Sequence, residues 1–125
     1  MSFRKFTEYG AASRTNVTIR TNDLLFISKN ILKQFNSENS EYAVIYIDDK
    51  NCLVGIKFFE DKPPNGDYRK LSKEKSGVSV NIAPVLRYLG IKKLHEKFTT
   101  GTQEKEGLLV FSLHNLKESQ LHLPV

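Results

Sequence analysis

The feature that most constrains the fold of this chain is a pattern that occurs twice. An apolar run leads into a short helix, because Ser28 suits an N-cap position and the apolar residues after it recur at helical spacing. Two stretches rich in β-branched and aromatic side chains then flank a polar turn, which predicts a hairpin. In the first unit, about residues 17–59, the segments are residues 17–19 and 24–27 (strands), 29–35 (helix), and 42–47 and 52–59 (hairpin).

The pattern returns in the second half of the chain. A constant shift of 54 residues in the sequence aligns Phe35 with Leu89. Pro84 suits the first turn of a helix, and Gly90 suits the position just after its last turn. Two prolines and a glycine between residues 62 and 67 predict the linker between the units. In the second unit, about residues 68–113, the segments are residues 77–80 (strand), 84–89 (helix), and 97–100 and 108–113 (hairpin strands joined by a polar turn).

A unit of about 45 residues cannot bury both faces of its strands alone. We therefore expect the two units to complete one another across a pseudo-two-fold axis. The predicted fold is α+β, with two β-α-β-β units packed as one barrel-like antiparallel sheet and two short helices. We predict one domain over residues 1–125, with residues 114–125 as a C-terminal tail.

Composition restricts the class of protein. The 125 residues contain no apolar stretch near the ~20 residues that a bilayer span needs. The amino end lacks the apolar region of a signal peptide, and the single cysteine, Cys52, permits no internal disulfide. These features predict a cytoplasmic protein.

The net charge of +5 is unevenly distributed. Residues 61–99 carry nine basic groups against four acidic groups, and residues 1–20 carry four against one. Residues 21–60 carry four basic groups against six acidic groups. Clustered positive charge attracts phosphate backbones through counterion release. The alternative is a solvated, lysine-rich surface.

Two segments resemble a known family. Residues 23–35 followed by residues 41–54, and residues 77–91 with their closing Leu-Gly-Ile, are similar to the AbrB-type swapped-hairpin domain. The tandem arrangement resembles the MraZ branch of that group, and the resemblance covers about residues 17–58 and 68–113. It implies a DNA-binding transcription factor that pairs hairpins and often forms homo-oligomers.

The chain departs from the family at several positions. Leu24 and Val78 stand where an arginine usually follows the turn glycine. Ser28 and Ile82 stand where the helix usually starts with proline, and Pro84 is displaced. Ser40 and Glu41 replace the glycine-aspartate turn before the hairpin. The family uses these positions for DNA contact and turn geometry.

The densest basic stretch lies between residues 67 and 75 and leads into Gly77. As a loop, it would bring four cations and one tyrosine to a nucleic-acid backbone. The alternative is a solvated strand with alternating lysines. In the amino arm, Phe3 and Phe6 either stack on bases or form an edge strand. The candidate nucleic-acid-binding residues are Arg14, Arg20, Tyr68, Arg69, Lys70, Lys73 and Lys75.

The tail from Gln120 to Val125 is similar to the short peptide by which bacterial proteins bind the replication sliding clamp. In an extended peptide, Leu121 and Leu123 would enter apolar pockets while Gln120 forms hydrogen bonds. The alternative is a terminal segment that packs back on the barrel.

Catalytic groups are sparse. The three histidines lack metal-ligand spacing, Cys52 falls in a predicted buried strand, and no glycine-rich phosphate loop occurs. We predict a non-enzymatic DNA-binding protein that regulates transcription, with no cofactor, metal site or membrane partner. The first alternative is a single-stranded nucleic-acid binder or replication accessory protein that binds a sliding clamp. The second is a protein-interaction module whose charge only aids solubility.

Overall fold

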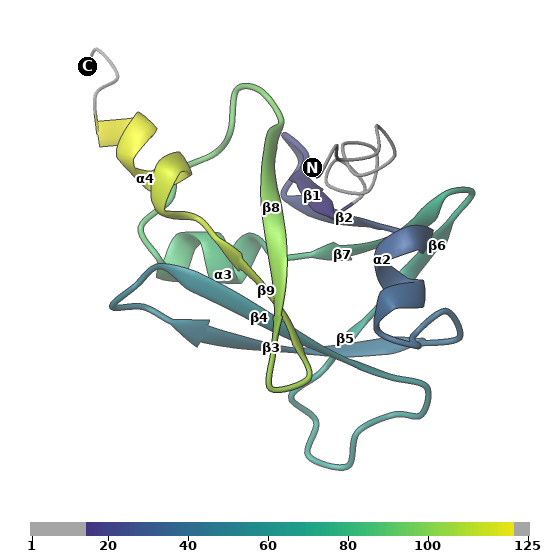
Figure 1. The fold of residues 1–125 in the computed structure, drawn as a ribbon. Coiled ribbons are helices and arrows are strands. Elements are labelled where there is room, and N and C mark those ends of the chain that lie inside the picture. The colour runs from purple at the N-terminus through teal and green to yellow at the C-terminus, as the bar shows by residue number, and fades with distance from the viewer. Residues whose placement is uncertain (1–14, 122–125) are drawn as a thin grey trace, which may run out of the picture.

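A computed structural model describes residues 15–121 (Figure 1). Within this range the chain forms nine strands and three short helices, so the fold is α+β. The elements are β1 (Asn16–Ile19), β2 (Leu24–Ser28), α2 (Lys29–Gln34), β3 (Tyr42–Asp48), β4 (Leu53–Phe59), β5 (Arg69–Lys70), β6 (Ser72–Glu74), β7 (Gly77–Asn81), α3 (Ala83–Tyr88), β8 (Phe98–Lys105), β9 (Leu108–Ser112) and α4 (His114–Leu121).

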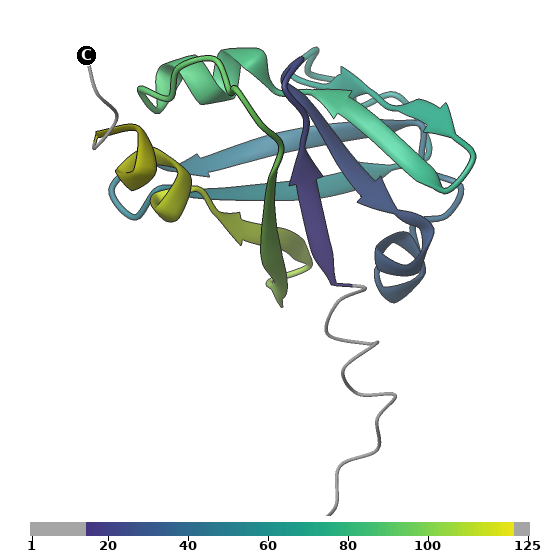
Figure 2. The same cartoon turned by 90° about the horizontal axis from the view of Figure 1, so that it is seen from above.

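The strands form one antiparallel sheet that nearly closes into a barrel. Their order is β5-β3-β4-β9-β8-β1-β2-β7-β6. The strands at the two ends of this order, β5 and β6, are separated in the chain only by Leu71. One short run of residues therefore pairs with β3 on one side and with β7 on the other, as can be followed in Figures 1 and 2.

The two predicted units are present and exchange their hairpins. The units are β2-α2-β3-β4 and β7-α3-β8-β9, and they meet where β2 pairs with β7 and where β4 pairs with β9. The hairpin of the second unit lies between β4 of the first unit and β1, the strand that precedes that unit. Helices α2 and α3, one from each unit, occupy opposite sides of the barrel (Figures 1 and 2). The predicted fold class is confirmed, and α4 is an additional helix.

The correspondence between the two units changes along the chain. The two helices correspond at the shift of 54 residues that the sequence predicted, since α2 begins at Lys29 and α3 at Ala83. In the strands before the helices it is displaced, because the inward residue of β2 that matches Val80 is Ile27, not its neighbour Phe26. A constant shift therefore applies to the helices but not to these strands.

One continuous apolar core fills the barrel. It includes the inward residues of the strands and the buried face of each helix, Ile31 and Leu32 in α2 and Val85 and Leu86 in α3. The Ser28 hydroxyl accepts a hydrogen bond from the Ile31 N–H, so the predicted N-cap of α2 is confirmed.

Two local predictions were wrong. Cys52 lies in the hairpin turn with a φ of 56°, and β4 begins only after it. Strand β8 continues to Lys105 instead of ending at Thr100, because its register with β1 and β9 supports residues whose own pattern is polar. The polar turn is therefore only Glu106 and Gly107, both with positive φ, as a type I′ turn requires.

The basic stretch and the tail also differ from the expected conformations. Residues 69–74 form strands, not a loop, because Leu71 is buried between two pairing segments. The tail is helical up to Leu121 and is not the extended docking peptide that was one of its two interpretations. The Leu116 side chain is buried and anchors this helix on the barrel. Within residues 15–121, every helix is too short and too polar to cross a bilayer.

Candidate nucleic-acid interface

Exposed cations lie along the run that forms strands β5 and β6, and β6 passes close to helix α2. Arg69, Lys70, Lys73 and Lys75 are exposed on one continuous run of chain. A hollow of about 380 Å³ lies between this run and α2, and Lys29 and Lys33 of the helix line it together with Lys73. We call this surface the basic strip and define it by the residues Arg69, Lys70, Lys73, Lys75, Lys29 and Lys33.

The local backbone explains why the helix and the strands meet here. Strand β7 pairs with β2, which runs directly into α2, so the turn between β6 and β7 lies against the start of the helix. The Lys29 N–H donates to the Ser76 carbonyl oxygen at 3.0 Å. Gly77 begins β7 at a point where even a Cβ atom would lie 2.1 Å from the Ile27 carbonyl oxygen. This close approach brings cations that are distant in the sequence onto one surface.

The cations of the basic strip differ in their partners. The Lys73 ammonium donates to the Ser40 carbonyl oxygen at 2.5 Å, a neutral partner that fixes its position without compensating its charge. Among residues 15–121, no carboxylate lies within ion-pair distance of any of the six cations. Two carboxylates, Glu38 and Glu74, also line the hollow. The charge of Glu74 is compensated by Arg20, so the strip keeps a positive surplus.

Arg20 was expected to contact phosphate, but its guanidinium is already paired within the molecule. Both terminal nitrogens donate to the Glu74 carboxylate at 2.8 Å, and the group lies 5.0 Å from the centroid of the Phe26 ring. The Arg20 hydrogen bonds, assisted by one from Ser79, lower the pKa of Glu74 to about 2. The pKa of Arg20 is raised by the same hydrogen bonds. This bidentate pair connects β1 to β6.

Tyr68 lies at the start of the strip but is half-buried. Its ring packs edge-on against Tyr42 with 5.3 Å between centroids, and the Lys62 ammonium lies 5.4 Å from the same ring. An aromatic ring held in this way offers less surface for base stacking than the sequence suggested. The adjacent Arg69 and Lys70 are exposed. Arg14 lies outside the described residues.

The sequence did not indicate three cations at this surface. Lys29 and Lys33 lie on the exposed side of α2, and their approach to Lys73 depends on the pairing of β2 with β7. Lys62 approaches Tyr68 from the linker. The sequence did indicate that Lys29 and Lys33 are exposed, because they lie on the predicted helix beside the buried pair Ile31 and Leu32.

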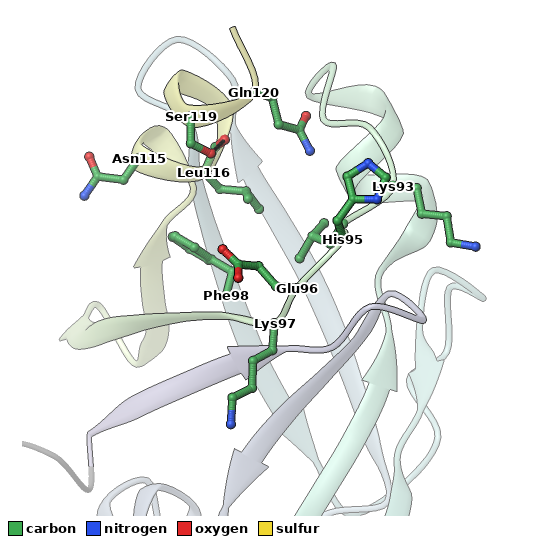
Figure 3. A pocket seen from close by; sticks show the side chains of 10 residues that line it. Lys93, His95, Glu96, Lys97, Phe98, Asn115, Leu116, Ser119 and Gln120 are labelled. Atoms are coloured by element: carbon green, nitrogen blue, oxygen red, sulfur yellow. Dashed lines mark hydrogen bonds between the residues drawn. The ribbon is translucent and has the colours of Figure 1, made fainter. Parts of the chain in front are cut away.

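The tail helix forms the wall of a second hollow, of about 390 Å³ (Figure 3). Phe98 and Leu116 line it, and Lys93 and Asn115 lie at its margin with the ends of their side chains directed outward. The Gln120 side chain is fixed at its edge. Its amide nitrogen donates to the Lys92 carbonyl oxygen at 2.9 Å, and its amide oxygen accepts from the Lys92 N–H at 2.7 Å.

These contacts bear on the predicted clamp-binding residues. Gln120 is engaged within the molecule, and Leu121 has a side chain that is largely exposed at the end of α4. Leu123 lies outside the described residues. Up to Leu121, the tail therefore packs back on the barrel, which is the alternative that the sequence left open.

Cys52 and the acidic turn have structural surroundings. The Cys52 side chain is buried, and this burial raises the pKa of its thiol. The Asp48 carboxylate accepts hydrogen bonds from the side chain and the backbone N–H of Asn51, which lower its pKa. Among residues 15–121, no three His, Cys, Asp or Glu side chains are grouped as metal ligands would be.

Comparisons of the whole sequence with protein-family models and with curated proteins, and of the fold with solved structures, found no match.

Proposed function

We propose that this protein binds DNA through the basic strip and acts as a non-enzymatic regulator of transcription. The observation that carries the proposal is the group of exposed cations on the strand run 69–75 and on α2, which have no ion-paired carboxylate among residues 15–121. Three of them, Lys73, Lys29 and Lys33, line one hollow. Lysine and arginine side chains in such a strip neutralise successive phosphates and release their counterions. The role in transcription rests on the resemblance to the AbrB and MraZ families.

The strip suits phosphate contacts better than base recognition. Its cations come from the run of two short strands, β5 and β6, with the turn after it, and from a six-residue helix, and Lys73 is held by the Ser40 carbonyl oxygen. A held cation loses less conformational freedom when it contacts a phosphate. Arg20 is excluded from this role by its pairing with Glu74.

A salt titration tests the proposal. We expect the full chain to bind a labelled duplex with an affinity that falls steeply as salt rises, measured by fluorescence anisotropy. The triple variant Arg69→Gln, Lys70→Gln, Lys75→Gln should lower the slope of log K against log salt by about 3, because each lost phosphate contact removes about 0.9.

The chain offers a matched control. Lys92, Lys93 and Lys97 are also exposed but lie beside the tail helix, away from the strip. Replacing these three lysines by glutamine changes the net charge by the same amount and should leave the slope nearly unchanged. Equal losses in the two triple variants would contradict a localised interface. A flat salt response of the wild type would favour the protein-interaction module, and tighter binding to single strands than to duplex would favour the single-strand binder.

A further inference from the structure

The outer edge of strand β3 is only partly covered. Strand β5 pairs with Tyr42 and Ala43 and then ends, whereas β4 pairs with all seven residues on the other edge. Between residues 15 and 121, no strand pairs with residues 44–48 on the outer side. Every second residue of this edge therefore presents an N–H and a carbonyl group that can pair with a further strand.

This edge lacks the protection that two other incompletely paired strands, β8 and β6, carry. Residues 44–47 read Val-Ile-Tyr-Ile, with no lysine, proline or glycine. By contrast, β8 ends in Glu104 and Lys105 beyond its pairing with β1, and β6, at the other end of the sheet, carries Lys73 and Glu74. Charged side chains at an edge discourage pairing with another chain, and β3 has none before Asp48.

The apolar side chains of this edge are accessible. Tyr46 is 47% exposed and Ile47 is 38% exposed, and successive residues of a strand point to opposite faces. A strand added to this edge would therefore gain apolar contacts on both faces of the sheet. The edge is suited to bind an extended, apolar strand.

The charges at the ends of the edge indicate which strand fits. Asp48 and Asp49 lie at one end. At the other end, Lys57 stands opposite Val44 in β4, and Arg69 stands opposite Ala43 in β5. If a second copy of β3 paired antiparallel with the first around Tyr46, the acidic end of each copy would meet the basic end of the other. Parallel pairing would place like charges together.

We propose that two copies of this chain associate through their β3 edges, antiparallel and around a two-fold axis at Tyr46. The same patch serves both copies, as a closed two-fold dimer requires, and the two tyrosines become a cross-strand aromatic pair. The contact is short, so it buries less area than a standard stable interface, and we expect dissociation at about 10–100 µM. This association does not require nucleic acid.

Sedimentation velocity on the full chain without DNA tests the proposal, at concentrations from about 5 to about 500 µM so that both monomer and dimer are sampled. Tyr46→Lys should weaken dimerisation at least tenfold, because the two-fold axis places the two new ammonium groups against one another. The matched control, Leu121→Lys, adds the same charge at an exposed large apolar side chain on α4 and should leave dimerisation unchanged. Circular dichroism verifies that each variant is folded.

A charge exchange tests the orientation without altering the apolar edge. Asp49→Lys and Arg69→Asp should each weaken the dimer, and the two changes combined should restore it, because each acidic end meets a basic end. A wild-type protein that stays monomeric over the whole range would overturn the proposal. So would equal effects of Tyr46→Lys and Leu121→Lys, or a double charge variant no better than the singles.

Discussion

The two units of the barrel have the same backbone at positions where their side chains differ. At the end of α2, the Asn36 N–H donates to the Lys33 carbonyl oxygen at 3.1 Å, and the residue has a φ of 52°. At the end of α3, the Gly90 N–H donates to the Arg87 carbonyl oxygen at 3.0 Å, and the residue has a φ of 79°. The next N–H bonds back across the last turn in both units, at 2.8 Å. Both helices therefore end in a residue with a left-handed backbone, but this residue is asparagine in the first unit and glycine in the second.

At another equivalent pair of positions, the difference between the units has become an interaction. Arg20 follows β1 and Glu74 ends β6, and both lie beside the first residue of the strand that leads into a helix. The Arg20 N–H donates to the Leu24 carbonyl oxygen at the start of β2, and Glu74 stands opposite Gly77 at the start of β7. The Arg20 and Glu74 side chains meet in a bidentate ion pair. Two identical units would place like charges here, so the divergence of the halves stabilises their association within one chain.

The largest expected effect comes from Gly77, whose equivalent in the first unit is Leu24. A Cβ atom at Gly77 would lie 2.1 Å from the Ile27 carbonyl oxygen, a backbone atom fixed by the pairing of β2 with β7. We expect Gly77→Ala to lower the free energy of unfolding by about 3 kcal/mol, measured by urea denaturation, because the two strands must separate.

Leu24→Ala is the matched control for that change. Leu24 is half-buried at the other end of the same strand pair, so its truncation removes a modest apolar contact. We expect a loss of about 1 kcal/mol. If Gly77→Ala and Leu24→Ala lowered the free energy of unfolding by similar amounts, the two ends of the β2–β7 pairing would not differ as we infer.

The ion pair between the units is the second test, through its pH dependence. Glu74 has a pKa of about 2 in the folded protein against 4.5 for an unperturbed glutamate, because Arg20 hydrogen-bonds its charged form. Its stabilisation is complete above about pH 4.5 and is lost as the pH falls toward 2. The side chains are 37% and 28% exposed, so screening by solvent limits the contribution to about 1 kcal/mol.

Urea unfolding at several pH values between 2 and 6 measures this loss. Glu74→Gln should remove that part of the pH dependence, whereas Glu38→Gln, a carboxylate on the same hollow without an arginine partner among residues 15–121, should keep it. Arg20→Glu alone should destabilise by placing two carboxylates together. The exchanged pair, Arg20→Glu with Glu74→Arg, should recover much of the loss, and a failure to recover would show that the two positions are not interchangeable.

The sequence predicted those parts of the fold that local patterns encode. The N-cap at Ser28, the apolar helix faces and the first hairpin follow from spacing and residue type, and the repeated order implied two halves completing one sheet. The predicted strand ended too early at residue 100, because residues 101–105 have no apolar alternation. Only pairing with β1 and β9 makes these residues part of β8. The helical tail was missed for a similar reason, since Leu116 is its one buried side chain among the described residues.

The candidate interface was predictable only where it is continuous in sequence. Arg69, Lys70, Lys73 and Lys75 are close along the chain, so their clustering was visible. The contribution of α2 depends on long-range strand pairing, and so does the withdrawal of Arg20 by a distant glutamate. A lone cation in a sequence carries no sign of the carboxylate that it will meet in the fold.

The smallest expected effects are at the helix ends, and they test the shared backbone directly. Gly90→Ala adds a Cβ that approaches only the end of the Lys117 side chain, at 3.8 Å, so its cost is the left-handed backbone itself, about 1 kcal/mol. Asn36→Gly removes the same kind of strain and should stabilise by about 0.5 kcal/mol. Gly90→Asn, which copies the first unit into the second, should cost less than Gly90→Ala. Thermal and urea unfolding of the three variants ranks their stabilities. A Gly90→Asn variant as unstable as Gly90→Ala would mean that the two helix ends share a backbone geometry but that only the end of α2 accepts asparagine.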